Sequence, residues 1–187
     1  MTLETSGPFS LTIYPDPGEP RFCAKCAASL EAKERGGRLR PHCPRCGWTY
    51  FAKPALGAAA LIETDGCILL VQRAENPYKG FWMLPAGFVE YDEYAKIAAE
   101  REVEEETGLK VAIGEFFGLY WGTDDPRNPS HLAVYRAQVV GGTPQPGDDA
   151  SSLAWFSHDS LPGEIAFAGQ REAIADWAAA RKRALGQ

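Results

Sequence analysis

Three glutamates at helical spacing constrain this chain more than any other feature of its sequence. We interpret residues 87–109 ("GFVEYDEYAKIAAEREVEEETGL") as a helix that ends before Gly108. Glu102, Glu105 and Glu106 stand at positions i, i+3 and i+4 of it and project from one face. Like charges at this spacing destabilise an isolated helix by roughly 0.2–0.5 kcal/mol per pair, and the helix dipole disfavours carboxylates near the C-terminal end. Such a conflict with local preferences is typical of a functional site.

A solvated acidic face is the alternative interpretation of this helix. Such a face ordinarily carries Lys or Arg one turn away from each carboxylate. Arg101 can pair with Glu105, whereas Lys110 lies beyond Gly108, so two of the three glutamates lack a partner. A bound divalent cation resolves the repulsion. Carboxylate oxygens with no Cys or His nearby favour Mg²⁺ or Mn²⁺ over zinc.

The same segment resembles the Nudix box. Nine spaced positions match, namely Gly87, Glu93, Arg101, Glu102, Val103, Glu105, Glu106, Gly108 and Leu109. The resemblance covers the chain from about residue 54 to its end. It implies an α/β fold, a Nudix α/β/α sandwich with a mixed sheet, and metal-dependent hydrolysis of a nucleoside diphosphate linked to another group.

The resemblance also implies roles for the residues of the box. The catalytic metal ligands are the carboxylates of Glu102, Glu105 and Glu106, with the carbonyl of Gly87 completing the site. Two or more Mg²⁺ or Mn²⁺ ions would bridge phosphate oxygens, lower the pKa of a bound water and stabilise the leaving phosphate. Glu93 and Arg101 would support the helix, as an ion pair.

The sequence leaves the proton acceptor open. Relatives often carry a Glu a few residues before a Trp-Phe pair, and this chain has Ser152 at that position. Asp148 and Asp149 lie close by, and Glu105 or Glu106 are the other candidates.

Candidate substrate contacts are aromatic or basic. Tyr78, Trp82, Trp121 and Phe167 are candidates to stack on adenine or flavin, with core packing as the alternative for each. We favour Phe167, which resembles an aromatic residue found there in relatives. Arg73, at the end of a predicted strand, either contacts phosphate or pairs with a glutamate.

Two cysteine pairs predict a zinc ribbon near the N-terminus. Cys23-x2-Cys26 and Cys43-x2-Cys46, sixteen residues apart, have the spacing of a four-thiolate site. Such a closed site has no open position for substrate, so we expect one structural Zn²⁺. A disulfide pair or a redox motif is the alternative. Cys67 stands alone in "DGCILLVQR", where we expect a small apolar residue inside a buried strand.

The distribution of charge and the positions of prolines divide the chain into a tail over 1–20, a ribbon over 21–52 and a Nudix domain over 53–187. We expect a short strand around 10–14. Residues 23–53 hold seven Lys or Arg and two Glu, so their net charge is +5. Because the whole chain has a net charge of −6, the remaining residues have a net charge of −11. This basic excess is either a nucleic-acid footprint or an offset for the charge of about −2 left by four thiolates around Zn²⁺. We favour the offset, because aromatic residues occur only at the ribbon's edges.

The hydrophobic pattern of the domain alternates strands and helices. We predict strands over 55–63, 67–73, 80–84, 111–122, 131–140 and 152–156, a tight turn at 64–66, a loop at 141–149, and a closing helix over 164–185. In that helix Ile174, Trp177 and Ala178 form one apolar stripe.

A ribbon placed before a Nudix domain resembles the NADH pyrophosphatases. Their Ser-Gln-Pro-Trp-Pro-Phe-Pro-type signature is absent, because that region reads "GLYWGTDDPRNPSHLAVY". The chain is more similar to the short ADP-ribose or FAD pyrophosphatases, and we weigh these two substrates equally, with AMP as a product. The alternatives are an NADH or NAD-capped RNA pyrophosphatase and a nucleotide sensor that does not hydrolyse.

The expected partner is a small nucleotide, with nucleic acid not favoured and no membrane. Relatives are commonly homodimers, and we expect the same here by analogy. The N-terminus has neither a basic start nor an apolar run, so we expect a cytoplasmic protein.

Overall fold

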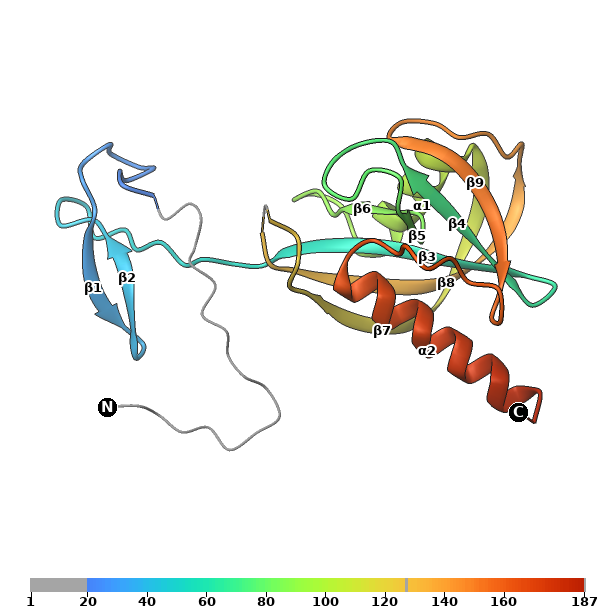
Figure 1. Ribbon diagram of the computed structural model, residues 1–187. Coiled ribbons are helices and arrows are strands. Elements are labelled where there is room, and N and C mark those ends of the chain that lie inside the picture. The colour runs from blue at the N-terminus through green and yellow to red at the C-terminus, as the bar shows by residue number, and fades with distance from the viewer. Residues whose placement is uncertain (1–19, 127, 187) are drawn as a thin grey trace. The chain divides into compact units, whose positions relative to one another are not determined.

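The computed structural model describes residues 20–126 and 128–186. The strand expected around 10–14 lies outside the described residues. The chain divides into two compact units, Met1–Lys53 and Pro54–Gln187 (Figure 1). Each unit is described by itself.

The first unit is a zinc-ribbon-like hairpin. β1 (Glu31–Arg35) and β2 (Arg38–His42) pair antiparallel around Gly36 and Gly37, both of which have positive φ. Among residues 20–53, only the side chains of Cys23, His42 and Cys43 are buried. A unit with so little buried surface depends on some other source of stability.

The second unit is built around a seven-stranded sheet, with the order β5-β4-β3-β8-β7, in which β6 also pairs with β3 and β9 with β4. Its strands are β3 (Ala55–Thr64), β4 (Cys67–Arg73), β5 (Trp82–Met83), β6 (Ala86–Phe88), β7 (Leu109–Gly122), β8 (Ser130–Gly142) and β9 (Ala150–Ser157). The sheet is mixed, because β3 runs parallel to β8 and the other pairs are antiparallel. The predicted turn joins β3 to β4, with Asp65 and Gly66 at positive φ.

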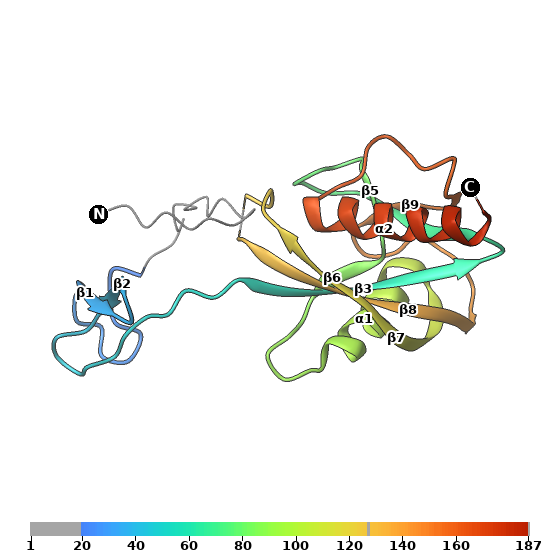
Figure 2. The ribbon, with the colours of Figure 1, turned by 90° about the horizontal axis from the view of Figure 1, so that it is seen from below.

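Two helices cover opposite faces of this sheet (Figure 2). Successive residues of β3 point to opposite sides. Ala58 packs against α1 (Ala95–Thr107), while Ala59 and Leu61 join the core under α2 (Ala168–Ala184). The predicted stripe of α2 is confirmed, because Ile174, Trp177 and Ala178 are all buried. The α/β/α sandwich with a mixed sheet is therefore as predicted.

Both predicted helices start too early in the sequence. Gly87 and Phe88 belong to β6, which pairs with β3, and a turn follows, so α1 begins only at Ala95. The closing helix begins at Ala168 rather than at residue 164. Ile165 forms a parallel bridge with Trp82, and Ala166 N–H donates to the Trp82 carbonyl at 2.9 Å. Strand pairing across the sheet replaces the first helical turn in each case.

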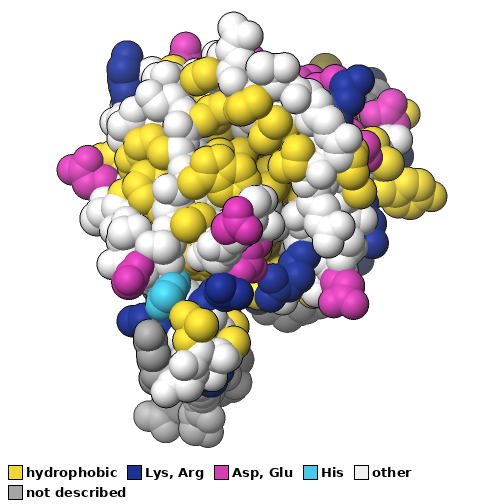
Figure 3. Space-filling view, turned by 90° about the vertical axis from the view of Figure 1, so that its right-hand side faces the viewer, with side chains coloured by type: hydrophobic (Ala, Val, Ile, Leu, Met, Phe, Trp, Pro, Cys, Tyr) yellow, Lys and Arg dark blue, Asp and Glu magenta, His cyan; other side chains and the backbone are white. Residues whose placement is uncertain are grey.

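Cys67 also differs from expectation, because it is half-buried at the first position of β4 rather than enclosed within the strand. Figure 3 shows the side of the domain where the β3–β4 turn lies, with hydrophobic side chains gathered in the middle and charged ones around them. None of the helices in the described part of the chain is long and apolar enough to cross a membrane.

Candidate active site

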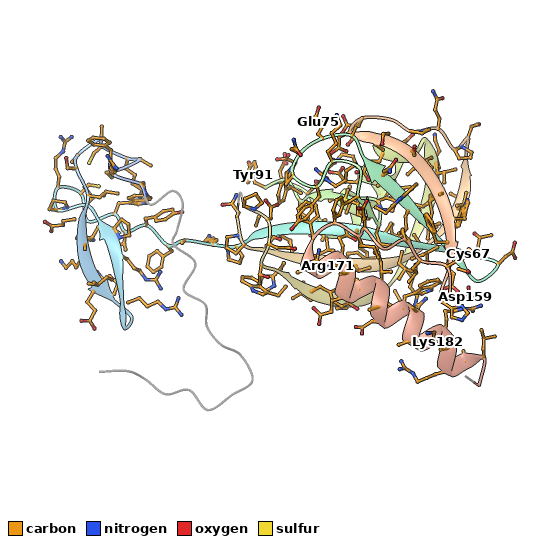
Figure 4. All side chains as sticks on the ribbon, in the orientation of Figure 1. Cys67, Glu75, Tyr91, Asp159, Arg171 and Lys182 are labelled. Atoms are coloured by element: carbon orange, nitrogen blue, oxygen red, sulfur yellow. The ribbon has the colours of Figure 1, made fainter. Side chains whose placement is uncertain are left out.

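A cleft of about 260 Å³ opens beside β6 and α1. Its lining also includes residues of β3, β4, β5, β7 and β8, the loop before β9 and the first turn of α2. Figure 4 labels Glu75, in the loop after β4, and Arg171, in the first turn of α2, both far from Cys67 at the opposite end of the domain. Segments distant in sequence thus converge on one end of the sandwich.

Two of the three spaced glutamates line this cleft. Glu106 is 1% exposed, and its Oε2 accepts the Ala86 N–H at 2.9 Å. Burial raises the pKa of Glu106 well above its ordinary value, against the effect of the Ala86 N–H, and the charges of Asp149 and Glu102 raise it further. Burial also raises the pKa of Glu102. Arg101 partly offsets the effect of burial at Glu102, whereas Glu106 has no such positive charge beside it among the described residues.

Gly87 lies directly against Glu102. A Cβ at this position would collide with the carboxyl group of Glu102. The backbone at Gly87 is ordinary β6 strand paired with Ala58, so close approach rather than conformation requires glycine here. The missing side chain lets the strand backbone and the carboxylate meet at the wall of the cleft.

Arg101 gathers three of the carboxylates around one guanidinium. It donates to Glu93 Oε1 at 2.7 Å, to Glu102 Oε1 at 2.7 Å and to Glu105 Oε2 at 3.0 Å. Glu105 is half-exposed and does not line the cleft. The expectation that two of the three box glutamates lack a cationic partner is wrong, because Glu102 also has Arg101. Glu106 is left without a Lys or Arg partner among the described residues.

The candidates for the proton acceptor fall in different places. Asp148 and Asp149 line the cleft, and Asp149 lies close enough to Glu106 to affect its pKa. Ser152 pairs with Gln72 inside the β4–β9 ladder and is absent from the lining. Of these three candidates, only Asp148 and Asp149 line the cleft, so Ser152 is not positioned to accept a proton there.

Arg73 and Phe167 meet at the wall of the cleft. The Arg73 guanidinium carbon lies 5.1 Å from the centre of the Phe167 ring, and both residues line the cavity. Arg73 is 6% exposed, donates to the Pro77 carbonyl at 2.8 Å and forms an ion pair with Asp149 at 3.8 Å. The acidic partner of Arg73 is thus an aspartate rather than a glutamate.

The other aromatic candidates lie around the cleft rather than in its lining. Tyr78 packs edge-on against Phe167, with ring centres 5.0 Å apart. Trp82 packs against Phe156 in the core under α2, and Trp121 packs against His131. Trp82 is therefore a core residue rather than a residue that stacks on the substrate.

Asp124 belongs to no pattern that the sequence analysis recognised. It accepts the Ala168 N–H at 2.7 Å, Arg171 Nη2 at 2.6 Å and Tyr78 Oη at 3.0 Å. Burial raises its pKa, but these three donors outweigh burial, so the pKa of Asp124 lies below its ordinary value. One carboxylate thus fixes the start of α2 and the loop after β4. Its partners are more than forty residues away, so no local pattern reveals it.

The four cysteines of the ribbon come together. The sulfur atoms of Cys23, Cys26, Cys43 and Cys46 lie within 4.8 Å of one another. Cys46 N–H points to Cys43 Sγ at 3.4 Å. Burial alone would raise the pKa of Cys43, but the N–H groups of Cys46 and Arg45 lower it to about 7. Four converging sulfurs on two knuckles fit a tetrahedral Zn²⁺ site.

The cleft offers hard ligands instead. Glu106, Glu102 and Asp149 supply oxygen atoms only, and the buried Glu106 carboxyl has no cationic side chain beside it in the described part of the chain. This donor set fits Mg²⁺ or Mn²⁺.

Comparison with known proteins identifies the family. The model of the NUDIX domain matches residues 52–177. The ADP-ribose pyrophosphatase of Methanocaldococcus jannaschii is 40% identical over 121 residues, which are 64% of this chain and 71% of the relative. An NAD-capped RNA hydrolase of Chromobacterium violaceum is 32% identical over 145 residues, which are 76% of this chain and 52% of that protein. This chain thus spans about half the length of the RNA hydrolase.

A solved structure agrees with the sequence relatives. The crystal structure of a NUDIX hydrolase from Nitrosomonas europaea matches with a TM-score of 0.76 and 27% identity, over 90% of this chain and 94% of that one. The α/β/α sandwich, the acidic helix at the cleft and these matches agree, and the chain belongs to the Nudix hydrolase family.

Proposed function

We propose that this protein hydrolyses the pyrophosphate bond of a nucleoside diphosphate linked to another group, with ADP-ribose as substrate and AMP as a product. The observation that carries the proposal is the buried Glu106 carboxyl in the cleft, beside Glu102 and Asp149 and with no cationic side chain against it among the described residues. A pyrophosphate would be repelled by these carboxylates unless divalent cations lie between them. ADP-ribose ranks above FAD because a relative of that activity is 40% identical.

The metal ligands in this proposal are Glu102, Glu105 and Glu106 with the Gly87 carbonyl, for two or more Mg²⁺ or Mn²⁺ ions. When bound, the ions supply charge neutralisation and a water of lowered pKa. The chain itself holds Glu106 in place through the Ala86 N–H and orients Glu102 through Arg101.

Other residues of the chain position the substrate and accept the proton. Phe167 offers an aromatic face to the base, and Arg73, packed on that ring, offers positive charge to the phosphates. Asp149, at the edge of the cleft near Glu106, is placed to accept the proton of the attacking water.

The ribbon in this proposal holds one structural Zn²⁺ through its four cysteines. The domain boundaries at about residues 20 and 53 are part of the same proposal. We also expect a homodimer, by analogy with relatives, and sedimentation of the zinc-loaded protein tests this.

Hydrolysis of NAD-capped RNA is the second candidate function, favoured by the relatives that carry out this reaction. A single assay separates the candidates. ADP-ribose, FAD, NADH and NAD-capped RNA are compared as substrates with Mg²⁺ or Mn²⁺, and the release of AMP, or of nicotinamide mononucleotide from the capped RNA, is followed. The proposal is supported if ADP-ribose is hydrolysed fastest of the four substrates. If capped RNA is hydrolysed fastest, the second candidate function replaces it. Binding of nucleotide without turnover of any of the four would make the protein a sensor.

A further inference from the structure

The β1–β2 hairpin carries four cations on one face. The register places Lys33 opposite Arg40 and Arg35 opposite Arg38. Directly opposed residues share a face of an antiparallel ladder, and so do residues two apart on one strand. All four side chains therefore project from the same side. Like charges placed directly opposite each other destabilise a strand pair, so this arrangement has a cost.

The chain itself does not neutralise this face. Within residues 20–126 and 128–186, no acidic side chain forms an ion pair with any of the four cations. Glu34 stands opposite Leu39 and therefore points to the other side of the hairpin. Glu31, on the same side, lies at the base of the hairpin opposite His42.

The zinc thiolates do not account for the cations at the tip. Arg35 and Arg38 flank the turn at Gly36 and Gly37, and five residues of extended chain lead from Arg38 to Cys43. Five residues of strand span about 16 Å. That separation exceeds the Debye length of about 8–10 Å at physiological salt, so these two charges do little to offset the metal site. The sequence analysis favoured the interpretation that the basic residues offset the charge of the zinc thiolates, and this interpretation fails for Arg35 and Arg38.

An aromatic ring completes the face. Phe51 follows the ribbon's last cysteine in sequence, yet its ring centre lies 4.6 Å from the Arg40 guanidinium carbon. Phe51 as a whole residue remains 53% exposed. The fold thus brings together the cations and the aromatic residue that the sequence separates. Cations that track phosphates, beside an aromatic ring that stacks on a base, are the combination that binds single-stranded nucleic acid.

We propose that this hairpin face, made of Lys33, Arg35, Arg38, Arg40 and Phe51, binds the phosphodiester backbone of single-stranded nucleic acid, with one base stacked on Phe51. The rest of the chain has a net charge of −11 and repels such a polyanion, so the binding is local to the ribbon. The inference concerns a surface outside the cleft and does not rest on the proposed hydrolysis.

The test uses the full-length, zinc-loaded protein without Mg²⁺, so that binding is measured without turnover. Fluorescence anisotropy follows labelled, uncapped oligouridine and oligothymidine of about 12 nucleotides. If four phosphates are contacted, the logarithm of the affinity falls with the logarithm of salt with a slope of about −2.8, so a fourfold rise in salt weakens binding roughly 50-fold. Arg35→Gln with Arg38→Gln reduces the slope to about −1.4, or roughly 7-fold.

A second variant isolates the stacking. Phe51→Ala weakens binding about tenfold and leaves the salt slope unchanged, because stacking is not an ionic interaction. The matched control is Lys182→Gln with Arg183→Gln, which removes the same charge from the exposed end of α2 and leaves affinity and slope unchanged. Zinc content checks that the hairpin variants keep the ribbon folded.

Equal binding of RNA and DNA supports the proposal, since the backbone is the shared ligand. No binding of either oligonucleotide, or equal weakening by the control variant, would overturn it. Binding to phosphatidylserine vesicles without binding to the oligonucleotides would overturn it in favour of a membrane surface. ADP-ribose hydrolysis by the hairpin variants is measured separately and stays unchanged, so a failure of either proposal leaves the other testable.

Discussion

Gly87 shows how a single residue controls the geometry of the cleft. Its Cα faces the Glu102 carboxyl group so closely that a methyl group would displace one of the two. Glu102 is in turn held by Arg101, which also holds Glu93. A disturbance at Gly87 therefore moves carboxylates that line the cleft, while the sheet around it keeps its backbone pairing.

We predict that Gly87→Ala lowers kcat/KM for ADP-ribose by about 10²-fold, because a displacement of about 1 Å in a reacting group has an effect of this size. Thermal unfolding should change little. Gly163→Ala is the matched control, since a Cβ there meets open space and the backbone φ is ordinary. Equal activity of the two variants would show that Glu102 is not positioned through Gly87.

The sequence analysis predicted the pairs of Arg101 with Glu93 and Glu105, but it did not predict that the same guanidinium also holds Glu102. Arg101 holds Glu102 and Glu105 because Glu93, in the turn before α1, holds the guanidinium from the other side. The choice of partner depends on where that turn places Glu93. The one-dimensional pattern contains no such information.

At the scale of elements, the start of α2 is set from outside the helix. Phe167, before its first residue, has a φ of 52° and gives no side-chain cap, while Asp124 accepts the Ala168 N–H from a distant loop. Periodicity predicted the helix and its buried stripe, because both follow from the local pattern. It placed the start of the helix four residues too early, because strand pairing and a long-range carboxylate decide where the helix begins.

We predict that the contribution of Asp124 depends on pH. Its pKa is lower in the folded protein than the unfolded value of about 3.9, so the ionised form stabilises the fold above that pH and the effect is lost as the pH falls through the folded pKa. Asp124→Asn should lower the free energy of unfolding by about 1–2 kcal/mol near neutral pH. The difference should shrink below about pH 4.

Chemical denaturation at several pH values measures this difference. Asp92→Asn, at an exposed position in the turn before α1, serves as the control and should be neutral throughout. A deficit of Asp124→Asn that stays constant down to low pH would mean that shape rather than charge matters at this position.

At the scale of the whole molecule, the sequence predicted both the sandwich and the ribbon, because each has a pattern that few other folds share. Cysteine spacing predicted the convergence of four sulfurs, the alternating apolar runs predicted the strands, and the resemblance to the Nudix box implied the mixed sheet. The position and size of the cleft were not predictable, since its lining comes from strands, loops and both helices that are far apart in the sequence. The two units also differ in what stabilises them.

We predict that removal of zinc unfolds the ribbon alone. Residues 20–53 bury only two cysteines and one histidine, so metal binding supplies most of their folding free energy. A chelator, or Cys43→Ser, should abolish amide-exchange protection in β1 and β2. The melting temperature of the unit from Pro54 onward should shift by less than about 2 °C. Cys67→Ser is the control, and simultaneous loss of protection in both units would contradict the prediction.

The most direct test of the proposed activity compares two glutamates of α1. Glu106→Gln removes a charge from the buried carboxyl at the cleft, and Glu104→Gln removes one from an exposed carboxyl that pairs with Lys110 at 3.8 Å. With Mg²⁺, we predict that Glu106→Gln lowers AMP release from ADP-ribose by about 10²-fold or more, whereas Glu104→Gln stays within about twofold of the unchanged protein. Equal activity of the two variants would contradict the assignment of this cleft as the active site.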